Sequence, residues 1–126
     1  MLLEGGCHCG QLRYRAQVED PKLIECNCSI CTKKGALHLR LEPAKVEFLK
    51  GKNNLTSYRF GTKKARHLFC STCGIAVYGH SRIAPELITL NARSLDQFHE
   101  LCADWPKVPF DGKNWEEAVA KIEAAQ

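Results

Sequence analysis

The sequence lacks any long apolar run. No stretch of its 126 residues approaches the ~18 consecutive apolar residues of a membrane helix. Residues 1–6 contain neither a basic segment nor a long apolar one, so no secretory signal is expected. Internal repeats, low-complexity tracts and interdomain linkers are also missing. We therefore expect a single domain over residues 1–126, without a membrane segment, in the cytoplasm.

The chain does contain the alternation that is typical of β-strands. In residues 11–19, Leu12, Tyr14, Ala16 and Val18 face one way and polar or charged residues face the other. Further strands are expected at 23–26, 36–41, 46–50, 55–60, 67–70, 75–78 and 87–91. Residues 51–54 are expected to join two of these, 46–50 and 55–60, as a hairpin. The patterns predict a mainly β fold.

One short helix is expected at the C-terminus. Asn114 is placed to cap it, with Glu117 three residues later as in a capping box. Apolar residues then recur at helical spacing and are expected to dock onto the sheet. The members of this stripe are Trp115, Ala118, Val119, Ile122 and Ala125.

The eight cysteines are the most informative residues. Seven of them form three short clusters, which are Cys7/Cys9, Cys26/Cys28/Cys31 and Cys70/Cys73. Residues i and i+2 of an extended segment face the same side, so each C-x-C pair can converge on one metal ion. The last cluster has the form of a zinc knuckle, in which Gly74 supplies the relaxed backbone of the turn. The clusters therefore predict metal sites with thiolate ligands.

Counting the ligands divides them between two zinc ions. A structural zinc takes four protein ligands, whereas a catalytic zinc keeps three and an open position. The middle cluster, Cys26, Cys28 and Cys31, can build an open site alone, and we expect its zinc at partial occupancy. The remaining four cysteines then close a structural site that joins distant parts of the chain. These four are Cys7, Cys9, Cys70 and Cys73.

Other interpretations of the cysteines stay open at this point. Disulfides fit i to i+2 spacing poorly and are rare in a reducing compartment. The spacing is not a standard iron–sulfur pattern, and a redox C-x-x-C would need a thioredoxin-like βαβ context. Cys102, outside the clusters, is expected to be a small buried residue. His67 is expected in the core or behind a ligand, and His8 is expected to point away from the metal.

The net charge does not favour nucleic acid as a partner. Lys and Arg outnumber Asp and Glu by 18 to 14, which gives +4. Seven thiolates and two Zn²⁺ add seven negative and four positive charges, so the metal-loaded chain would carry +1. Lys33, Lys34 and Arg66 could offset thiolate charge or meet an anionic ligand, and their roles stay open.

Several of these segments together resemble the glutathione-dependent formaldehyde-activating enzyme family, which includes the C-terminal domain of centromere protein V. The resemblance spans about residues 4–115. It rests on five segments: Gly5-Gly6-Cys7-His8-Cys9-Gly10, Cys26-Asn27-Cys28-Ser29-Ile30-Cys31, His67-Leu68-Phe69-Cys70-Ser71-Thr72-Cys73-Gly74, Asn91-Ala92-Arg93-Ser94-Leu95-Asp96 and Phe110-Asp111-Gly112-Lys113-Asn114-Trp115.

The resemblance implies a zinc-stabilised β-tent of antiparallel sheets and the metal partition already reached by counting. It also implies a carbon–sulfur lyase that joins glutathione and formaldehyde as S-(hydroxymethyl)glutathione, with Cys26, Cys28 and Cys31 at the catalytic zinc. The expected partners are a small thiol such as glutathione and a small aldehyde. The alternative hypothesis is a non-catalytic interaction module in which both zinc ions are structural. The sequence does not indicate the oligomeric state.

Overall fold

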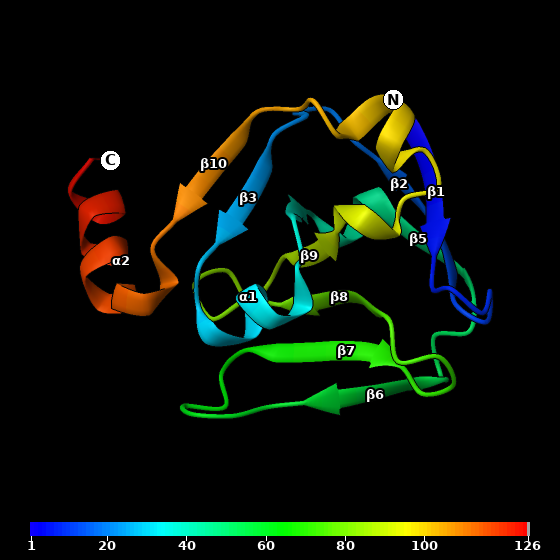
Figure 1. The fold of residues 1–126 in the computed structure, drawn as a ribbon, viewed down its shortest axis with the longest axis horizontal. Coiled ribbons are helices and arrows are strands. Elements are labelled where there is room, and N and C mark those ends of the chain that lie inside the picture. Colours follow the sequence, from blue (N-terminus) through cyan, green and yellow to red (C-terminus); the bar gives the residue numbers. More distant parts are fainter. Residues whose placement is uncertain (126) are drawn as a thin grey trace.

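The computed structural model describes residues 1–125 and confirms the mainly β fold (Figure 1). Ten strands form a three-stranded sheet, in the order β1-β2-β5, and a seven-stranded sheet, in the order β10-β3-β4-β9-β8-β7-β6. The strands are β1 Leu2–Gly6, β2 Arg13–Gln17, β3 Leu23–Cys26, β4 His38–Leu41, β5 Val46–Lys50, β6 Leu55–Tyr58, β7 Arg66–Cys70, β8 Ala76–His80, β9 Ile88–Asn91 and β10 Lys107–Phe110.

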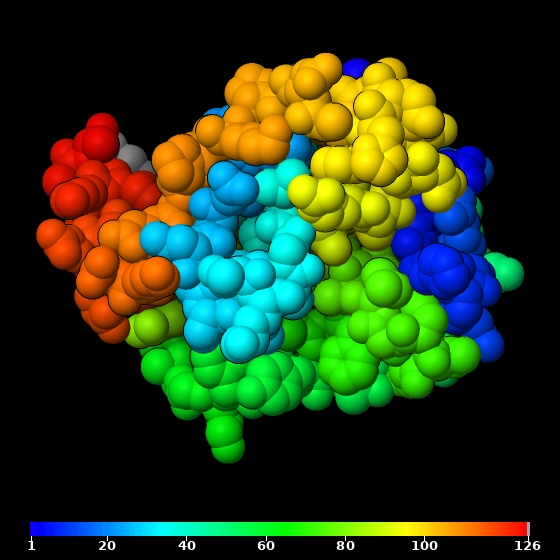
Figure 2. Space-filling view, in the orientation of Figure 1, coloured from blue at the N-terminus to red at the C-terminus, as the bar shows by residue number. Residues whose placement is uncertain are grey.

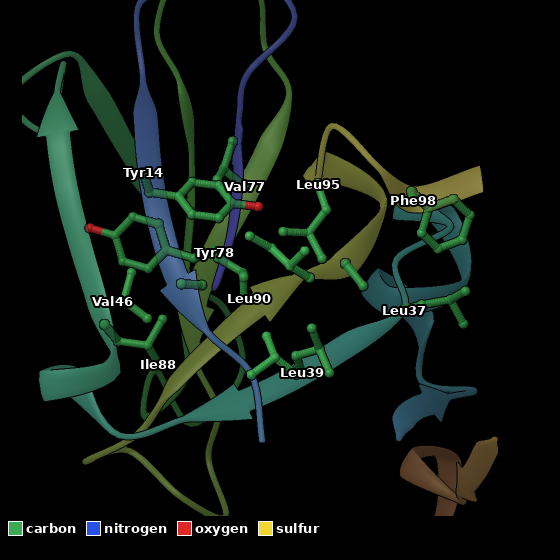
Figure 3. Packing of buried hydrophobic residues seen from close by; sticks show 14 of the residues in the cluster. Tyr14, Leu37, Leu39, Val46, Val77, Tyr78, Ile88, Leu90, Leu95 and Phe98 are labelled. Atoms are coloured by element: carbon green, nitrogen blue, oxygen red, sulfur yellow. The ribbon is translucent and has the colours of Figure 1, made fainter. Parts of the chain in front are cut away.

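The alternating segment forms the centre of the smaller sheet, as expected. In β2 and its flanks, Leu12, Tyr14 and Ala16 are fully buried, and Val18 is 2% exposed. The residues between them are only half-buried and lie on the opposite face. This sheet packs its apolar face against the larger one, because Tyr14 and Val46 belong to the same buried cluster as residues of β4, β8 and β9 (Figure 3).

The expected hairpin over residues 46–60 is wrong. Both strands form, but β5 pairs with β2 in the smaller sheet and β6 pairs with β7 at the edge of the larger one. Gly51 lies between them with φ +83°, and a Cβ there would overlap the backbone of Gln11. The turn therefore brings the chain against residues 11–12 and directs it into the other sheet, which a local turn signal does not reveal.

The far edge of the larger sheet contains a strand that the sequence did not predict. β10 pairs with β3 in parallel, from Lys107↔Leu23 to Phe110↔Cys26, and every other strand pair is antiparallel. β3 meets its other neighbour, β4, at the single pair Ile24↔His38. β3 and β10 therefore slant away from the rest of the sheet, as Figure 1 shows.

Two α-helices follow these outer strands. α1 (Ser29–Lys34) was not expected and comes directly after β3, whereas α2 (Trp115–Ala124) is the expected C-terminal helix. The capping box is wrong, because the Asn114 side chain donates to Asp111 instead of capping α2. No side chain of α2 is fully buried and Ile122 is 40% exposed, so the apolar stripe docks only through its first turns. No helix within residues 1–125 is long and apolar enough to span a membrane.

A buried hydroxyl pair connects the smaller sheet to the segment after β9. Tyr14 is fully buried, and its Oη lies 2.7 Å from Oγ of Ser94. The backbone of Gly5 approaches this pair so closely that an added Cβ would lie 2.5 Å from Oη of Tyr14. The Tyr14 hydroxyl therefore fits at this position only because Gly5 has no side chain.

We expect Tyr14→Phe to lower the free energy of unfolding by about 1 kcal/mol, because one buried hydrogen bond is lost while the ring stays in place. Urea unfolding should show a lower midpoint with an unchanged slope. Tyr58→Phe is the matched control, because Tyr58 is 51% exposed. Equal effects of the two substitutions would contradict this account.

Candidate metal centres and the adjoining cavity

The first cysteine cluster joins the two sheets. Cys7 and Cys9 follow β1, Cys70 ends β7, and Cys73 lies in the turn before β8. The four sulfur atoms all lie within 4.8 Å of one another, with Cys9 Sγ 3.6 Å from that of Cys7 and 3.7 Å from that of Cys70. The structure thus brings together the four cysteines predicted for the closed site. We call them the four-cysteine cluster.

The backbone around this cluster is arranged as in a metal knuckle. Gly10 and Gly74 each follow the second cysteine of a pair, and their φ angles are +81° and +80°. Backbone N–H groups approach the sulfurs, including those of Leu12 to Cys7 at 3.3 Å and Thr72 to Cys70 at 3.4 Å. Such donors stabilise negative sulfur, so the surroundings fit thiolates. Four converging thiolates are the ligand set of a structural zinc.

The second cluster is assembled within six residues. Cys26 ends β3, Cys28 lies in extended conformation before α1, and Cys31 lies within α1. Their sulfurs also lie within 4.8 Å of one another. α1 ends after six residues at Gly35, whose φ is +66°. This short helix brings Cys31 back toward the other two, and we call the three residues the triple-cysteine cluster.

The C-terminal segment packs directly against the triple-cysteine cluster. Asn27 Nδ2 donates to Asp111 Oδ1, and Asn27 Oδ1 accepts from the backbone N–H of Lys113, both at 3.0 Å. Gly112 lies between these contacts. A Cβ on Gly112 would lie 2.6 Å from Sγ of Cys26 and 2.7 Å from Cβ of Cys28. Any side chain at this position would therefore displace a cysteine.

The three sulfurs have different environments. The pKa of Cys26 is lowered to about 6, first by a hydrogen bond from Cys31 and also by the backbone N–H of Cys28. The same contact and burial raise the pKa of Cys31. His38 Nε2 lies 3.3 Å from Sγ of Cys31, and burial lowers the pKa of His38 to about 4. His38 is therefore neutral at pH 7 and contacts Cys31 as an uncharged partner.

A cavity of about 520 Å³ opens beside the triple-cysteine cluster. All three of its cysteines line the cavity, whereas no member of the four-cysteine cluster does. The other walls come from β4, the loop after β6, β7, β8 and the loop after it, β9, and the segment from Phe110 to Trp115. In the space-filling view, the cyan surface that includes α1 meets the green surface of β6–β8 below it and the orange segment beside it (Figure 2). The volume lies within the ~300–1,000 Å³ of small-molecule sites.

The basic residues whose roles the sequence left open have different positions relative to the cavity. Lys34 and Arg66 line the cavity, while Lys33 is exposed outside it. His67 is half-buried in the cavity wall, with Nδ1 3.3 Å from Nζ of Lys34. Cys102 is fully buried, as expected. His8 is exposed, in agreement with a side chain that points away from the sulfurs.

Sequence reasoning missed several residues of the cavity wall. His38, Arg40, Arg82 and Trp115 come from separate segments, and no spacing rule connects them. Arg82 stacks on Trp115, with its guanidinium carbon 3.6 Å from the ring centre. Only the approach of α2 to the loop after β8 brings these two residues together. A signal was available for Gly112, because glycine often marks a close backbone approach.

Comparison with known proteins identifies the family. A profile described as glutathione-dependent formaldehyde-activating enzyme matches residues 2–107. The chain belongs to this family. A Halomonas elongata protein provisionally named as a glutathione-dependent formaldehyde-activating enzyme is 31% identical over 118 residues, which cover 86% of this chain and 71% of that protein. The crystal structure of a Rhodobacter sphaeroides protein matches with a TM-score of 0.74 and 30% identity, over 84% of this chain and all of the other.

We expect the two clusters to respond differently to serine. Cys70→Ser should lower the free energy of unfolding by more than ~3 kcal/mol, as the loss of a structural metal does, because Cys70 lies in the link between the sheets. Cys31→Ser should leave the fold in place and remove one zinc. Metal analysis and urea unfolding of both variants test this. If both substitutions lower the free energy of unfolding equally, the division into a closed and an open site is contradicted.

Gly112→Ala should remove the second zinc selectively, because the added methyl group needs the space of Cys26 Sγ and Cys28 Cβ. We expect metal analysis to give one zinc per chain in place of two, with little change in thermal unfolding. Metal bound at the four-cysteine cluster would serve as the internal control. Two fully bound zinc ions in this variant would show that the close approach does not matter.

Proposed function

We propose that the chain is a zinc-dependent enzyme that forms and cleaves the bond between a thiol sulfur and the carbon of a small aldehyde. The reaction would resemble the synthesis of S-(hydroxymethyl)glutathione from glutathione and formaldehyde, a carbon–sulfur lyase reaction in its reverse direction. The observation that carries the proposal is that the triple-cysteine cluster lines the cavity while the four-cysteine cluster does not. Membership of the family supports the choice of thiol and aldehyde.

The donor sets fit zinc, which binds thiolates readily. In this proposal, Cys7, Cys9, Cys70 and Cys73 hold a structural zinc, and Cys26, Cys28 and Cys31 hold a second one. When bound at the second site, zinc would supply an open position at which a thiol loses its proton. A single domain over residues 1–126 and a cytoplasmic location are part of the proposal, since the ligands must stay reduced.

The chain's own residues would bind and orient the reactants. In the reaction, the thiol sulfur bonds to the carbonyl carbon, the C=O double bond becomes a single bond, and the thiol proton ends on the oxygen. Phe60, Phe110 and Trp115 line the cavity and would exclude water from the adduct. His38 would hold Cys31 in place through its contact with the sulfur.

Exchange NMR with labelled formaldehyde and glutathione tests the proposal. We expect the zinc-loaded protein to accelerate formation and cleavage of the adduct, and Cys28→Ser to abolish the acceleration. Cys102→Ala is the control, because Cys102 lies outside both clusters. Exchange no faster than without protein would exclude this activity. A stable protein partner found together with no binding of thiols would instead favour the interaction module.

A further inference from the structure

The unpaired polar atoms of the structure are concentrated in one place. Within residues 1–125, every buried side-chain nitrogen or oxygen without a hydrogen-bond partner belongs to a residue that lines the cavity. These atoms are Nδ1 of His38, Nε of Arg40, Nε of Arg66, Nε2 of His67, Nε of Arg82 and Oγ1 of Thr89. Buried polar groups are normally paired, so this concentration shows that the protein itself leaves the polar groups of the cavity wall poorly satisfied. Three of these residues are arginines, whose guanidinium groups can only donate, so a ligand that contacts them from the cavity must offer acceptors.

The charge of the residues that line the cavity also favours a ligand rich in hydrogen-bond acceptors. Five cationic side chains line the cavity, which are Lys34, Arg40, Arg66, Arg82 and Lys113, and no Asp or Glu lines it. Among residues 1–125, only Arg82 of these five forms an ion pair. Its partner is Glu116, at 3.7 Å, whose carboxylate is highly exposed. The cavity therefore carries an excess of positive charge.

The triple-cysteine cluster offsets only part of this charge. Burial lowers the pKa values of Lys34 and Arg40, and the negative charge of the Cys26 and Cys31 thiolates acts in the opposite direction. Three thiolates and one Zn²⁺ amount to a single negative charge. Arg66 on β7 and Arg82 after β8 remain with unpaired donors on different parts of the wall.

We propose that this wall selects thiols that carry two or more negative charges besides the sulfur, with Arg66 and Arg82 as the residues that bind the acidic groups. The inference rests on the proposed function for the choice of a thiol as substrate. It adds which residues bind the acidic groups of that thiol. Arginine pairs with both carboxylate and phosphate through two parallel hydrogen bonds. Uncharged and cationic thiols would leave these donors unpaired and would be rejected.

The test measures the binding of a substrate analogue that cannot react. S-Methylglutathione keeps both carboxylates and has no free thiol, and titration calorimetry on the zinc-loaded protein measures its affinity. We expect Arg66→Gln and Arg82→Gln each to weaken binding about 10- to 100-fold, because each loses charge-assisted hydrogen bonds. Lys64→Gln is the control. It removes a charge two residues from Arg66 at an exposed position outside the cavity, and it should change the affinity less than about twofold.

Two further ligands identify the acid that is recognised. The dimethyl ester of S-methylglutathione should bind at least about tenfold more weakly, because esterification removes both negative charges. S-Methyl phosphopantetheine presents a phosphate, so tighter binding of this compound would assign the acidic group to phosphate, and tighter binding of S-methylglutathione would assign it to carboxylates. Equal affinity of the ester and its parent acid would overturn the proposal.

The result can be separated from that of the proposed function. Thermal unfolding of the two arginine variants shows whether they remain folded, and wild-type affinity in both folded variants would overturn the arginine assignment even if adduct exchange is catalysed. If both variants unfold, the comparison of ester and acid on the unchanged protein decides. Charge-dependent binding without any adduct exchange would leave the acidic site established and exclude the reaction.

Discussion

The sulfur atoms of Cys7, Cys9, Cys70 and Cys73 come from two different sheets, so whatever holds these four atoms together also holds the sheets together. Four thiolates at such separations repel one another unless a cation lies between them. The N–H groups aimed at the sulfurs and the left-handed glycines of both turns prepare this position. The buried cluster around Tyr14 is then enclosed between two sheets whose relative position the cysteine link fixes.

The triple-cysteine cluster depends on the opposite feature, a separation of strands. β3 meets β4 at one pair only and continues with β10 as its parallel partner. α1 follows β3, and the segment around Gly112 packs against the cysteines of the same cluster. The cavity lies between this part of the molecule and residues of β4, β7, β8 and β9. The buried unpaired polar atoms found within residues 1–125 belong to residues of this cavity wall, where polar groups are left unsatisfied at some cost in stability.

Local pattern predicted most of the strands because their signals are local. The alternation at residues 11–19 produced β2, and residues 23–26 formed β3 with the expected bounds. The pairing of β5 and β6 was wrong because pairing depends on which sheet has a free edge. β10 was missed because its residues are largely exposed and contain Pro109, and α1 because six residues are too few for a helical period.

The sequence by itself determined which neighbouring cysteines converge, because C-x-C and C-x-x-C spacings place sulfurs together through local geometry alone. It also predicted the division into four and three from the coordination number of zinc, and the structure groups the sulfurs in the same way. Only the tertiary structure decided which cluster borders a cavity and which cations line it. His38, Arg66, Arg82 and Gly112 lie on four separate segments, and no local rule relates them. They meet only in the folded chain, because packing between distant segments brings them to one cavity wall.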